Sequence, residues 1–182
     1  MQPGRGVLLV AEPFLPDPNF FRTVVLLIEH NQEGTLGVVL NRPAAVRLQE
    51  ATDFFGAVDY PLFIGGPVQP EMLHALHTLP ALRERSQEVL PGLFWTPDMR
   101  ALRSILAMRD IPSSALRFYA GYAGWRVGQL DRELLLKSWI LAPAQSEDVF
   151  DPEPPQLWRK VLKRMGGQYA FIATFPEDPR VN

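Results

Sequence analysis

Short runs of apolar and β-branched residues, separated by turn residues, occupy much of the first half of the chain. The clearest pair is Phe21–Glu29 and Thr35–Leu40, joined by the turn cluster Asn31–Gly34. This pattern predicts a β-hairpin with a loop of about four residues. Because Val24–Ile28 is apolar without interruption, we expect that strand to be covered on both faces. The same criteria predict further strands at residues 6–11, 61–64, 73–78, 116–122, 139–141 and 169–175.

Apolar residues at helical spacing predict three helices, at residues 97–111, 129–138 and 154–165. Thr96 is the expected cap of the first, because its hydroxyl can accept a hydrogen bond from a free N–H of the first turn. In the second, Glu133 and Lys137 stand at i and i+4, a spacing at which they can form an ion pair. Strands and helices do not alternate regularly, so we expect an α+β fold with a mixed sheet rather than a doubly wound one.

The length of 182 residues, with 47% hydrophobic and 21% charged positions, suits a single domain over residues 1–182. The chain has no cysteine, which excludes a disulfide framework, a cysteine-ligated metal site and a thiol nucleophile. A formal net charge of −2 argues against a broad nucleic-acid-binding face. The apolar runs Val7–Ala11 and Val24–Ile28 are shorter than a signal-peptide core or a membrane span requires. We therefore expect a cytoplasmic protein without a membrane contact.

The segment Gly121–Leu130 (GYAGWRVGQL) carries the densest group of candidate binding residues: Gly124, Trp125, Gly128 and Gln129. A strand that enters a glycine-bearing loop and then a helix can expose backbone N–H groups to an anion. The alternative is structural: the glycines allow close packing, Trp125 fills the core and Gly128 begins a helix. Asp131 and Glu133, in the first turns of that helix, favour the structural interpretation because they repel anions.

The three histidines are His30, His74 and His77. On a helix, His74 and His77 would share a face and could bind a metal together with His30. The segment around them reads as a strand, however, and there the two side chains point to opposite faces. We therefore predict no metal site and interpret His77 as a hydrogen-bonded core histidine, while keeping it as a candidate ligand contact.

Asn41 and Arg42 end the second hairpin strand, whereas His30 lies beside the turn that joins the two strands. Strands of about six residues separate these positions by about 20 Å, so His30 and Asn41 cannot line one small pocket within the hairpin. A position beside a turn explains the residue type at His30, and a strand end before a proline explains the residue type at Asn41, without a ligand site. A composite ligand site remains as a hypothesis, in which the Gly121–Gln129 loop meets His77 or Asn41.

One basic cluster, Trp158–Arg164, follows the polar face of the third predicted helix. Its charges are the solvated face that an amphipathic helix needs, and four charges would give only weak, salt-sensitive DNA binding. No second helix stands at helix-turn-helix spacing. The sequence also lacks the Gly-x-Ser-x-Gly motif and a paired-carboxylate setting, so it supports neither catalysis nor a cofactor.

Several segments together resemble the YqgE/AlgH family of bacterial proteins: Gly6–Pro13 (GVLLVAEP), Phe21–Asn31 (FRTVVLLIEHN), Gly34–Pro43 (GTLGVVLNRP), Gly65–Val68 (GGPV) with Leu76-His77, and Gly121–Trp125 (GYAGW) with Gly128–Leu130 (GQL) and Trp139. The resemblance implies a single α+β domain whose bifurcated mixed sheet bends into a pseudo-barrel with about three flanking helices. It also implies a cytosolic bacterial protein. Members are commonly described as transcriptional regulators, but the family has no established activity or catalytic residues.

Two functional hypotheses follow. The first is a non-catalytic regulatory or interaction domain that contacts an unidentified protein or small molecule and affects transcription indirectly. The second is a small-molecule or anion-binding domain, with or without enzymatic activity, whose site lies near Gly121–Gln129. Direct nucleic-acid binding is disfavoured by the charge balance.

Overall fold

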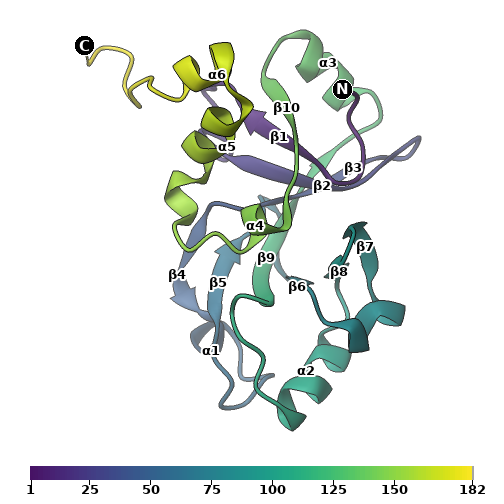
Figure 1. Cartoon of the computed structure of the whole chain (residues 1–182). Coiled ribbons are helices and arrows are strands. Elements are labelled where there is room, and N and C mark those ends of the chain that lie inside the picture. Colours follow the sequence, from purple (N-terminus) through teal and green to yellow (C-terminus); the bar gives the residue numbers. More distant parts are fainter. Residues whose placement is uncertain (182) are drawn as a thin grey trace.

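The computed structural model describes residues 1–181 and contains one mixed, ten-stranded sheet with several helices (Figure 1). The strands are β1 (Val7–Ala11), β2 (Val24–Asn31), β3 (Gly34–Val39), β4 (Pro43–Arg47), β5 (Pro61–Ile64), β6 (Val68–His77), β7 (Gln87–Leu90), β8 (Leu93–Thr96), β9 (Leu116–Trp125) and β10 (Trp139–Pro143). The helices are α1 (Leu48–Ala51), α2 (Met99–Met108), α3 (Gln129–Leu135), α4 (Ser146–Val149), α5 (Leu157–Met165) and α6 (Gly167–Ile172), with 3-10 turns η1 (Pro80–Arg85) and η2 (Pro154–Gln156).

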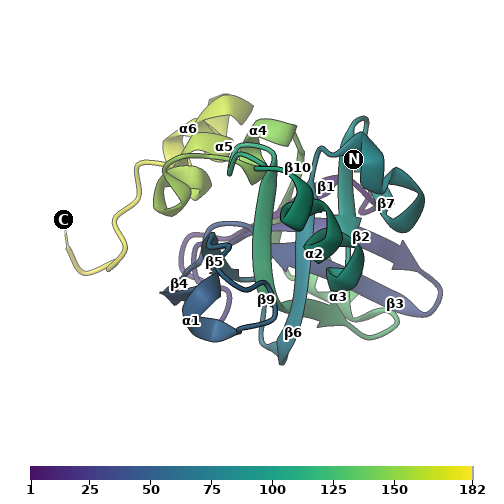
Figure 2. The ribbon, with the colours of Figure 1, turned by 90° about the horizontal axis from the view of Figure 1, so that it is seen from below.

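The sheet branches at β9. The path of neighbouring strands is β10-β1-β2-β3-β9-β6-β8-β7, and β5, which carries β4, pairs with β9 in parallel. The first half of β9 lies between β5 and β6, whereas its last residues pair with β3. Figure 2 shows β9 and β6 side by side in the middle of the molecule, with β4 and β5 to one side and β2 and β3 to the other. The expected α+β fold with a bifurcated mixed sheet is confirmed.

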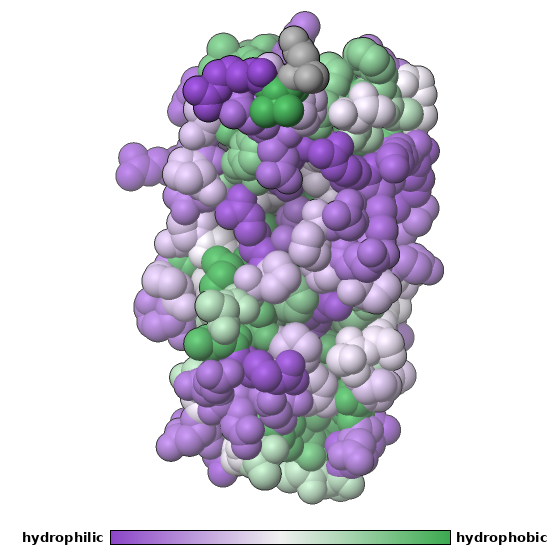
Figure 3. All heavy atoms as spheres, turned by 90° about the vertical axis from the view of Figure 1, so that its left-hand side faces the viewer, coloured by the Kyte–Doolittle hydropathy of each residue, from purple (hydrophilic) through white to green (hydrophobic). Residues whose placement is uncertain are grey.

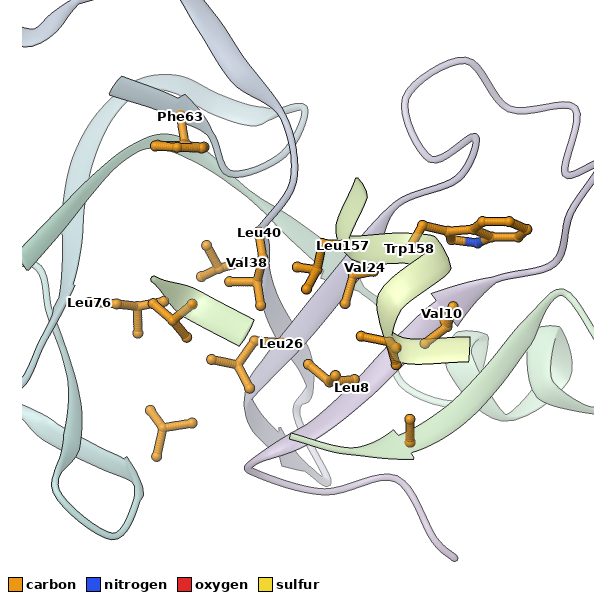
Figure 4. Packing of buried hydrophobic residues seen from close by; sticks show 14 of the residues in the cluster. Leu8, Val10, Val24, Leu26, Val38, Leu40, Phe63, Leu76, Leu157 and Trp158 are labelled. Atoms are coloured by element: carbon orange, nitrogen blue, oxygen red, sulfur yellow. The ribbon is translucent and has the colours of Figure 1, made fainter. Parts of the chain in front are cut away.

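The hairpin β2–β3 is confirmed, and the expectation for Val24–Ile28 is also correct. All five residues have no exposed surface. Val24, Leu26 and Ile28 pack into one core cluster, and Val25 and Leu27 pack into another on the opposite face. Figure 4 shows Val24 and Leu26 with residues of β1, β3 and α5 in the first of these clusters. Trp158 links α5 to β1, because its indole N–H donates to the Ala11 carbonyl at 2.9 Å.

The three predicted helices correspond to α2, α3 and the η2–α5 segment. The cap of α2 differs from the expected one: the Asp98 carboxylate accepts from the Ala101 N–H, while Thr96 Oγ1 accepts from the Asp98 N–H. The strand predicted at residues 169–175 is wrong, since α6 forms there. Gly166 and Gly167 turn the chain with positive φ, and the apolar residues that follow then pack on the core beside α5 at helical spacing.

Sequence periodicity also missed β4, β7 and β8, each of which has only four or five residues. Three other strands are longer than predicted. β6 begins at Val68 rather than at residue 73, β9 continues to Trp125 rather than ending at residue 122, and β10 continues to Pro143. The segment Gly121–Trp125 is therefore strand, and only residues 126–128 form the loop before α3.

Candidate functional site

An open cleft of about 580 Å³ lies between the tip of the β2–β3 hairpin and the end of β9. Gly124 and Trp125 of β9 line it together with Gln129, the first residue of α3. Three of the candidate residues from the sequence are thus gathered here, and Gly128 lies directly before Gln129. The hairpin tip supplies the opposite wall.

The floor of the cleft follows from the register of three neighbouring strands. Glu29 of β2 pairs with Leu36 of β3, and Leu36 pairs with Gly124 of β9, so these positions form one row across the sheet. Gly124 is exposed. A Cβ placed there would meet Tyr122 and Val68 at ordinary distances of 3.6 and 3.8 Å. Packing does not require a glycine at this position, and its missing side chain leaves the floor open.

Two carboxylates and one guanidinium stand around this floor. Glu29 and Glu33 come from the hairpin, and Arg126 comes from the loop before α3. All three residues are exposed, and within residues 1–181 none of them has an ion-pair partner within 4.0 Å. Asn31 orders the hairpin tip, because its side-chain oxygen accepts from the Glu33 N–H at 2.8 Å. The charged rim therefore carries an excess of negative charge.

The start of α3 does not offer a free anion site. Gly128 precedes the helix with φ +72°, as a residue without a side chain easily does. The Gln129 side chain already accepts from the Arg126 N–H at 3.0 Å. With only seven residues in α3 and Asp131 in its first turn, the electrostatics of this end favour cationic or neutral groups over anions.

Beneath the cleft, the carboxylate of Glu133 holds two buried tryptophans. Its Oε2 accepts from the indole N–H of Trp125 at 2.9 Å and from that of Trp139 at 2.7 Å. Its Oε1 accepts from the Gln129 amide at 3.0 Å. The predicted ion pair between Glu133 and Lys137 is wrong. The helix ends at Leu135, and Lys137 has a left-handed backbone, so the i,i+4 spacing does not apply.

Replacing Glu133 by alanine is expected to lower the free energy of unfolding by about 2 kcal/mol, because two buried indole N–H groups lose their acceptor. Glu133→Gln is the matched control: it keeps one oxygen for the indoles and should cost clearly less. Urea unfolding followed by tryptophan fluorescence measures both. Equal costs for the two variants would contradict the role assigned to the carboxylate oxygens.

His77 lies in the core and does not line the cleft. Leu79 N–H donates to His77 Nδ1 at 3.0 Å, so the proton is on Nε2, which donates to Ser86 Oγ at 2.8 Å. His74 is on the other face of β6, as predicted, where Trp95 donates to its Nδ1 and its Nε2 donates to the Gly121 carbonyl. Burial lowers the pKa of both histidines, to about 4 for His77. Within residues 1–181 no group of three potential metal ligands occurs.

Asn41 and Arg42 lie at the opposite end of the hairpin from the cleft. The Asn41 side chain accepts from the Val24 N–H and donates to the Arg22 carbonyl, both at 2.9 Å, and so continues the strand pairing. Arg42 donates to the carbonyls of Phe21 and Pro18. The composite site, in which the Gly121–Gln129 segment meets His77 or Asn41, is therefore not assembled.

The basic cluster of α5 is largely engaged within the molecule. Lys160 pairs with Asp151 at 2.9 Å, Arg164 pairs with Asp148 at 2.7 Å, and Arg159 donates to the carbonyls of Ala173 and Phe175. Guanidinium and ammonium groups that already have partners are less available to neutralise phosphates. This arrangement agrees with a structural role for the helix.

Sequence reasoning missed the two carboxylates of the cleft, Glu29 and Glu33. The sequence predicts the hairpin, but it does not show which residues of β9 pair with β3, and this register places the two carboxylates at the cleft. Gly34 at the hairpin tip was a partial indication that β9 approaches the hairpin. Its φ is +136°, and a Cβ there would lie 2.7 Å from the Trp125 carbonyl oxygen. A glycine at a hairpin tip can indicate such a close approach of another strand.

Comparison with known proteins gives one consistent family. An AlgH-like family model matches residues 8–170. A UPF0301 protein of Chlorobaculum tepidum is 43% identical over 182 residues, which cover all of this chain and 96% of that protein. A UPF0301 protein of Cytophaga hutchinsonii is 36% identical, with 98% of each chain covered.

Two solved structures have the same fold. The crystal structure of DIP2367 from Corynebacterium diphtheriae superposes with a TM-score of 0.82 at 27% identity and covers 96% of this chain and 94% of its own. The solution structure of the AlgH protein from Pseudomonas aeruginosa gives a TM-score of 0.74 at 29% identity, with 97% and 98% covered. None of the helices within residues 1–181 has the length and apolar character needed to cross a membrane. By the extent of the family match and the identity to these relatives, the chain belongs to the AlgH-like family.

Proposed function

We propose that the protein is a non-catalytic interaction domain that binds a positively charged, extended segment of a partner protein in the cleft at the hairpin tip. The observation that carries this proposal is the pair of exposed carboxylates, Glu29 and Glu33, beside a floor left open at Gly124. Charge complementarity of this kind gives partner selection and a fast encounter rate.

The shape of the cleft favours a chain segment over a small metabolite. The row of positions across β2, β3 and β9 gives the cleft an extended floor, along which a chain segment can lie. Its floor offers the apolar surfaces of Leu36, Val68 and Tyr122, which suit the side chains of an extended peptide lying across the strands. Lysine or arginine residues of that peptide would meet the hairpin carboxylates.

The residues that line the cleft include neither histidine nor serine. Their one hydroxyl beside a histidine is that of Thr35, which is buried and already hydrogen-bonded to Nδ1 of His30 at 2.6 Å. His74 and His77 lie away from the cleft, buried with both ring nitrogens engaged. Regulation of transcription would then be indirect, through the protein partner. The internal partners of Arg159, Lys160 and Arg164 support this indirect route over direct contact with DNA.

A peptide array tests the proposal. Lysine- and arginine-rich peptides are expected to bind, acidic peptides of the same length are not, and binding should weaken as salt rises. Exchanging both carboxylates, Glu29→Lys with Glu33→Lys, should reduce affinity at least about tenfold. Gly124→Leu should also block binding by filling the floor.

Glu84→Lys is the matched control for the single variants Glu29→Lys and Glu33→Lys, because it makes the same change of +2 in charge at an exposed position of η1, away from the cleft. It should leave peptide binding unchanged. Equal binding of acidic peptides, or an equal loss of affinity in Glu84→Lys, would contradict the proposal. Pull-down with the wild type and the Gly124→Leu variant then identifies the partner by its absence from the second sample.

A further inference from the structure

A second cavity, of about 520 Å³, lies at the other end of the β2–β3 hairpin and is independent of the cleft. Its walls are mainly apolar and come from Phe14, Leu15, Phe21 and three prolines. Its two charged residues are Arg42, which follows β3, and Glu177 of the C-terminal tail. We refer to this cavity as the proline cup. Its volume is in the range of small-molecule sites.

The proline cup is held in shape before any ligand arrives. Prolines fix φ and reduce the freedom of the 13–19 loop. Asp17 closes a turn in that loop, because its backbone carbonyl accepts from the Phe20 and Phe21 N–H groups at 3.0 and 2.8 Å. Arg42 spans the loop from the other side, donating to the Phe21 carbonyl at 2.7 Å and to the Pro18 carbonyl at 3.2 Å. A preformed site loses less conformational entropy when it binds.

The positive charge of Arg42 has no direct counterion. Both of its hydrogen bonds go to neutral carbonyls, and within residues 1–181 no carboxylate lies within 4.0 Å of it. Partial burial lowers the pKa of Arg42, and the charge of Asp17 only partly offsets this. A half-buried guanidinium with unused N–H groups is a strong attractor for a carboxylate.

A second uncompensated guanidinium lies behind the tail that forms one wall of the cup. Arg22 is 8% exposed, and its Nε and Nη1 have no hydrogen-bond partner. Its Nη2 donates to the carbonyls of Phe175 and Pro176, just before Glu177. Arg22 also has a left-handed backbone, with φ +53°. Around the cup, the guanidinium groups of Arg22 and Arg42 thus stand near the carboxylates of Asp17 and Glu177, but within residues 1–181 neither guanidinium forms a direct ion pair.

We infer that the proline cup is a binding site for a small organic acid with an apolar body. The carboxylate would pair with Arg42, and the aliphatic or aromatic body would lie against Phe14, Leu15 and Phe21. A protein partner fits this place less well, because the side of the molecule toward which the tail extends is mostly hydrophilic, with only small apolar areas (Figure 3). Broad protein contacts need larger apolar patches.

The experiment titrates the full chain with octanoate and 3-phenylpropionate and with the corresponding neutral amides, followed by ¹H–¹⁵N NMR. The acids are expected to shift the signals of Arg42 and of the residues other than proline in the segment 14–21. They should also bind at least about tenfold more tightly than the amides, as a charge-assisted pair requires. Equal binding of acid and amide, absence of binding at millimolar concentration, or shifts confined to other residues would overturn the inference.

Two variants test the roles assigned to Arg42 and Glu177. Arg42→Gln should abolish the preference for acid over amide. Glu177→Gln removes the one carboxylate of the cup wall, and affinity for the acids should rise several-fold because the positive potential increases. Glu177 is exposed, so this variant keeps the test decisive even if Arg42→Gln destabilises the loop. Unchanged or weaker binding in Glu177→Gln would contradict the assigned electrostatics.

Discussion

Replacing Gly66 by alanine is expected to lower the free energy of unfolding by about 4 kcal/mol or more, a large part of the roughly 5–15 kcal/mol by which a domain is ordinarily stable. A Cβ at this position would lie 2.1 Å from the Tyr122 carbonyl carbon and 2.4 Å from the Ala123 nitrogen. These are backbone atoms of the central strand β9 and cannot rotate away. Gly66 also has φ +153°, a conformation that residues with side chains rarely adopt.

The expected cost has a structural reason beyond the local clash. The neighbouring Gly65 donates its N–H to Ala120 and accepts from Val39, so this segment joins β9 to the end of β3. Moving the backbone at Gly66 to accommodate a methyl group would disturb both strands where the sheet branches. Backbone strain and steric overlap therefore both lower the stability of the Gly66→Ala variant.

Two control variants separate backbone strain from steric overlap. Gly56 also has a positive φ, of +64°, but a Cβ there would meet nothing within 4 Å, so Gly56→Ala should cost only about 1 kcal/mol. Gly124→Ala, with ordinary contacts, should be nearly neutral. Thermal or urea unfolding of the three variants is the measurement. A Gly66→Ala protein as stable as Gly56→Ala would show that the close approach to β9 is not as described.

Acidification should destabilise the fold by about 3 kcal/mol through His77 alone. Burial lowers its pKa in the folded state from the ordinary 6.5 to about 4. The unfolded chain therefore binds a proton that the folded chain excludes. This contribution to stability is complete above pH 6.5 and is lost progressively as the pH falls from 6.5 to about 4.

Hydrogen bonding explains why the folded state excludes this proton. Leu79 N–H already donates to His77 Nδ1, and a protonated Nδ1 would place two donors face to face. His74 has the same constraint from the Trp95 indole, and its pKa is also lowered by burial. Its titration should add to the acid sensitivity in the same direction.

The test compares the pH dependence of urea unfolding in the wild type and in His77→Gln. Glutamine at position 77 does not titrate, so this variant should lose the part of the acid slope that His77 supplies, even if its overall stability is lower. Identical slopes in the wild type and His77→Gln would refute the assignment.

The local sequence determined the elements whose pattern is complete within a few neighbouring residues. The hairpin, the double burial of Val24–Ile28 and the three helices all follow from turn residues and from apolar periodicity. The placement of His74 and His77 on opposite faces of β6 follows from the alternation of a strand. These features depend on interactions between residues close in the chain, so composition and spacing were sufficient.

Local pattern failed where distant segments decide the outcome. Residues 169–175 are apolar except for Thr174 and suit either a strand or a helix. Packing against the core beside α5 selects the helix. Glu133 stands four residues before Lys137 in the sequence, but α3 ends at Leu135, and the buried indoles of Trp125 and Trp139 donate to the Glu133 carboxylate instead. The stronger, desolvated hydrogen bonds prevail over an exposed ion pair.

Both proposed sites are formed by segments that are distant in the sequence. The sequence by itself determined the fold class, the hairpin and the family resemblance, because these are carried by contiguous motifs. Only the tertiary structure placed Glu29 and Glu33 beside Gly124, and Arg42 beside Phe14 and Glu177. Strand register and the return of the C-terminal tail set those neighbours, and such long-range pairing leaves no periodic trace in the residues that it joins.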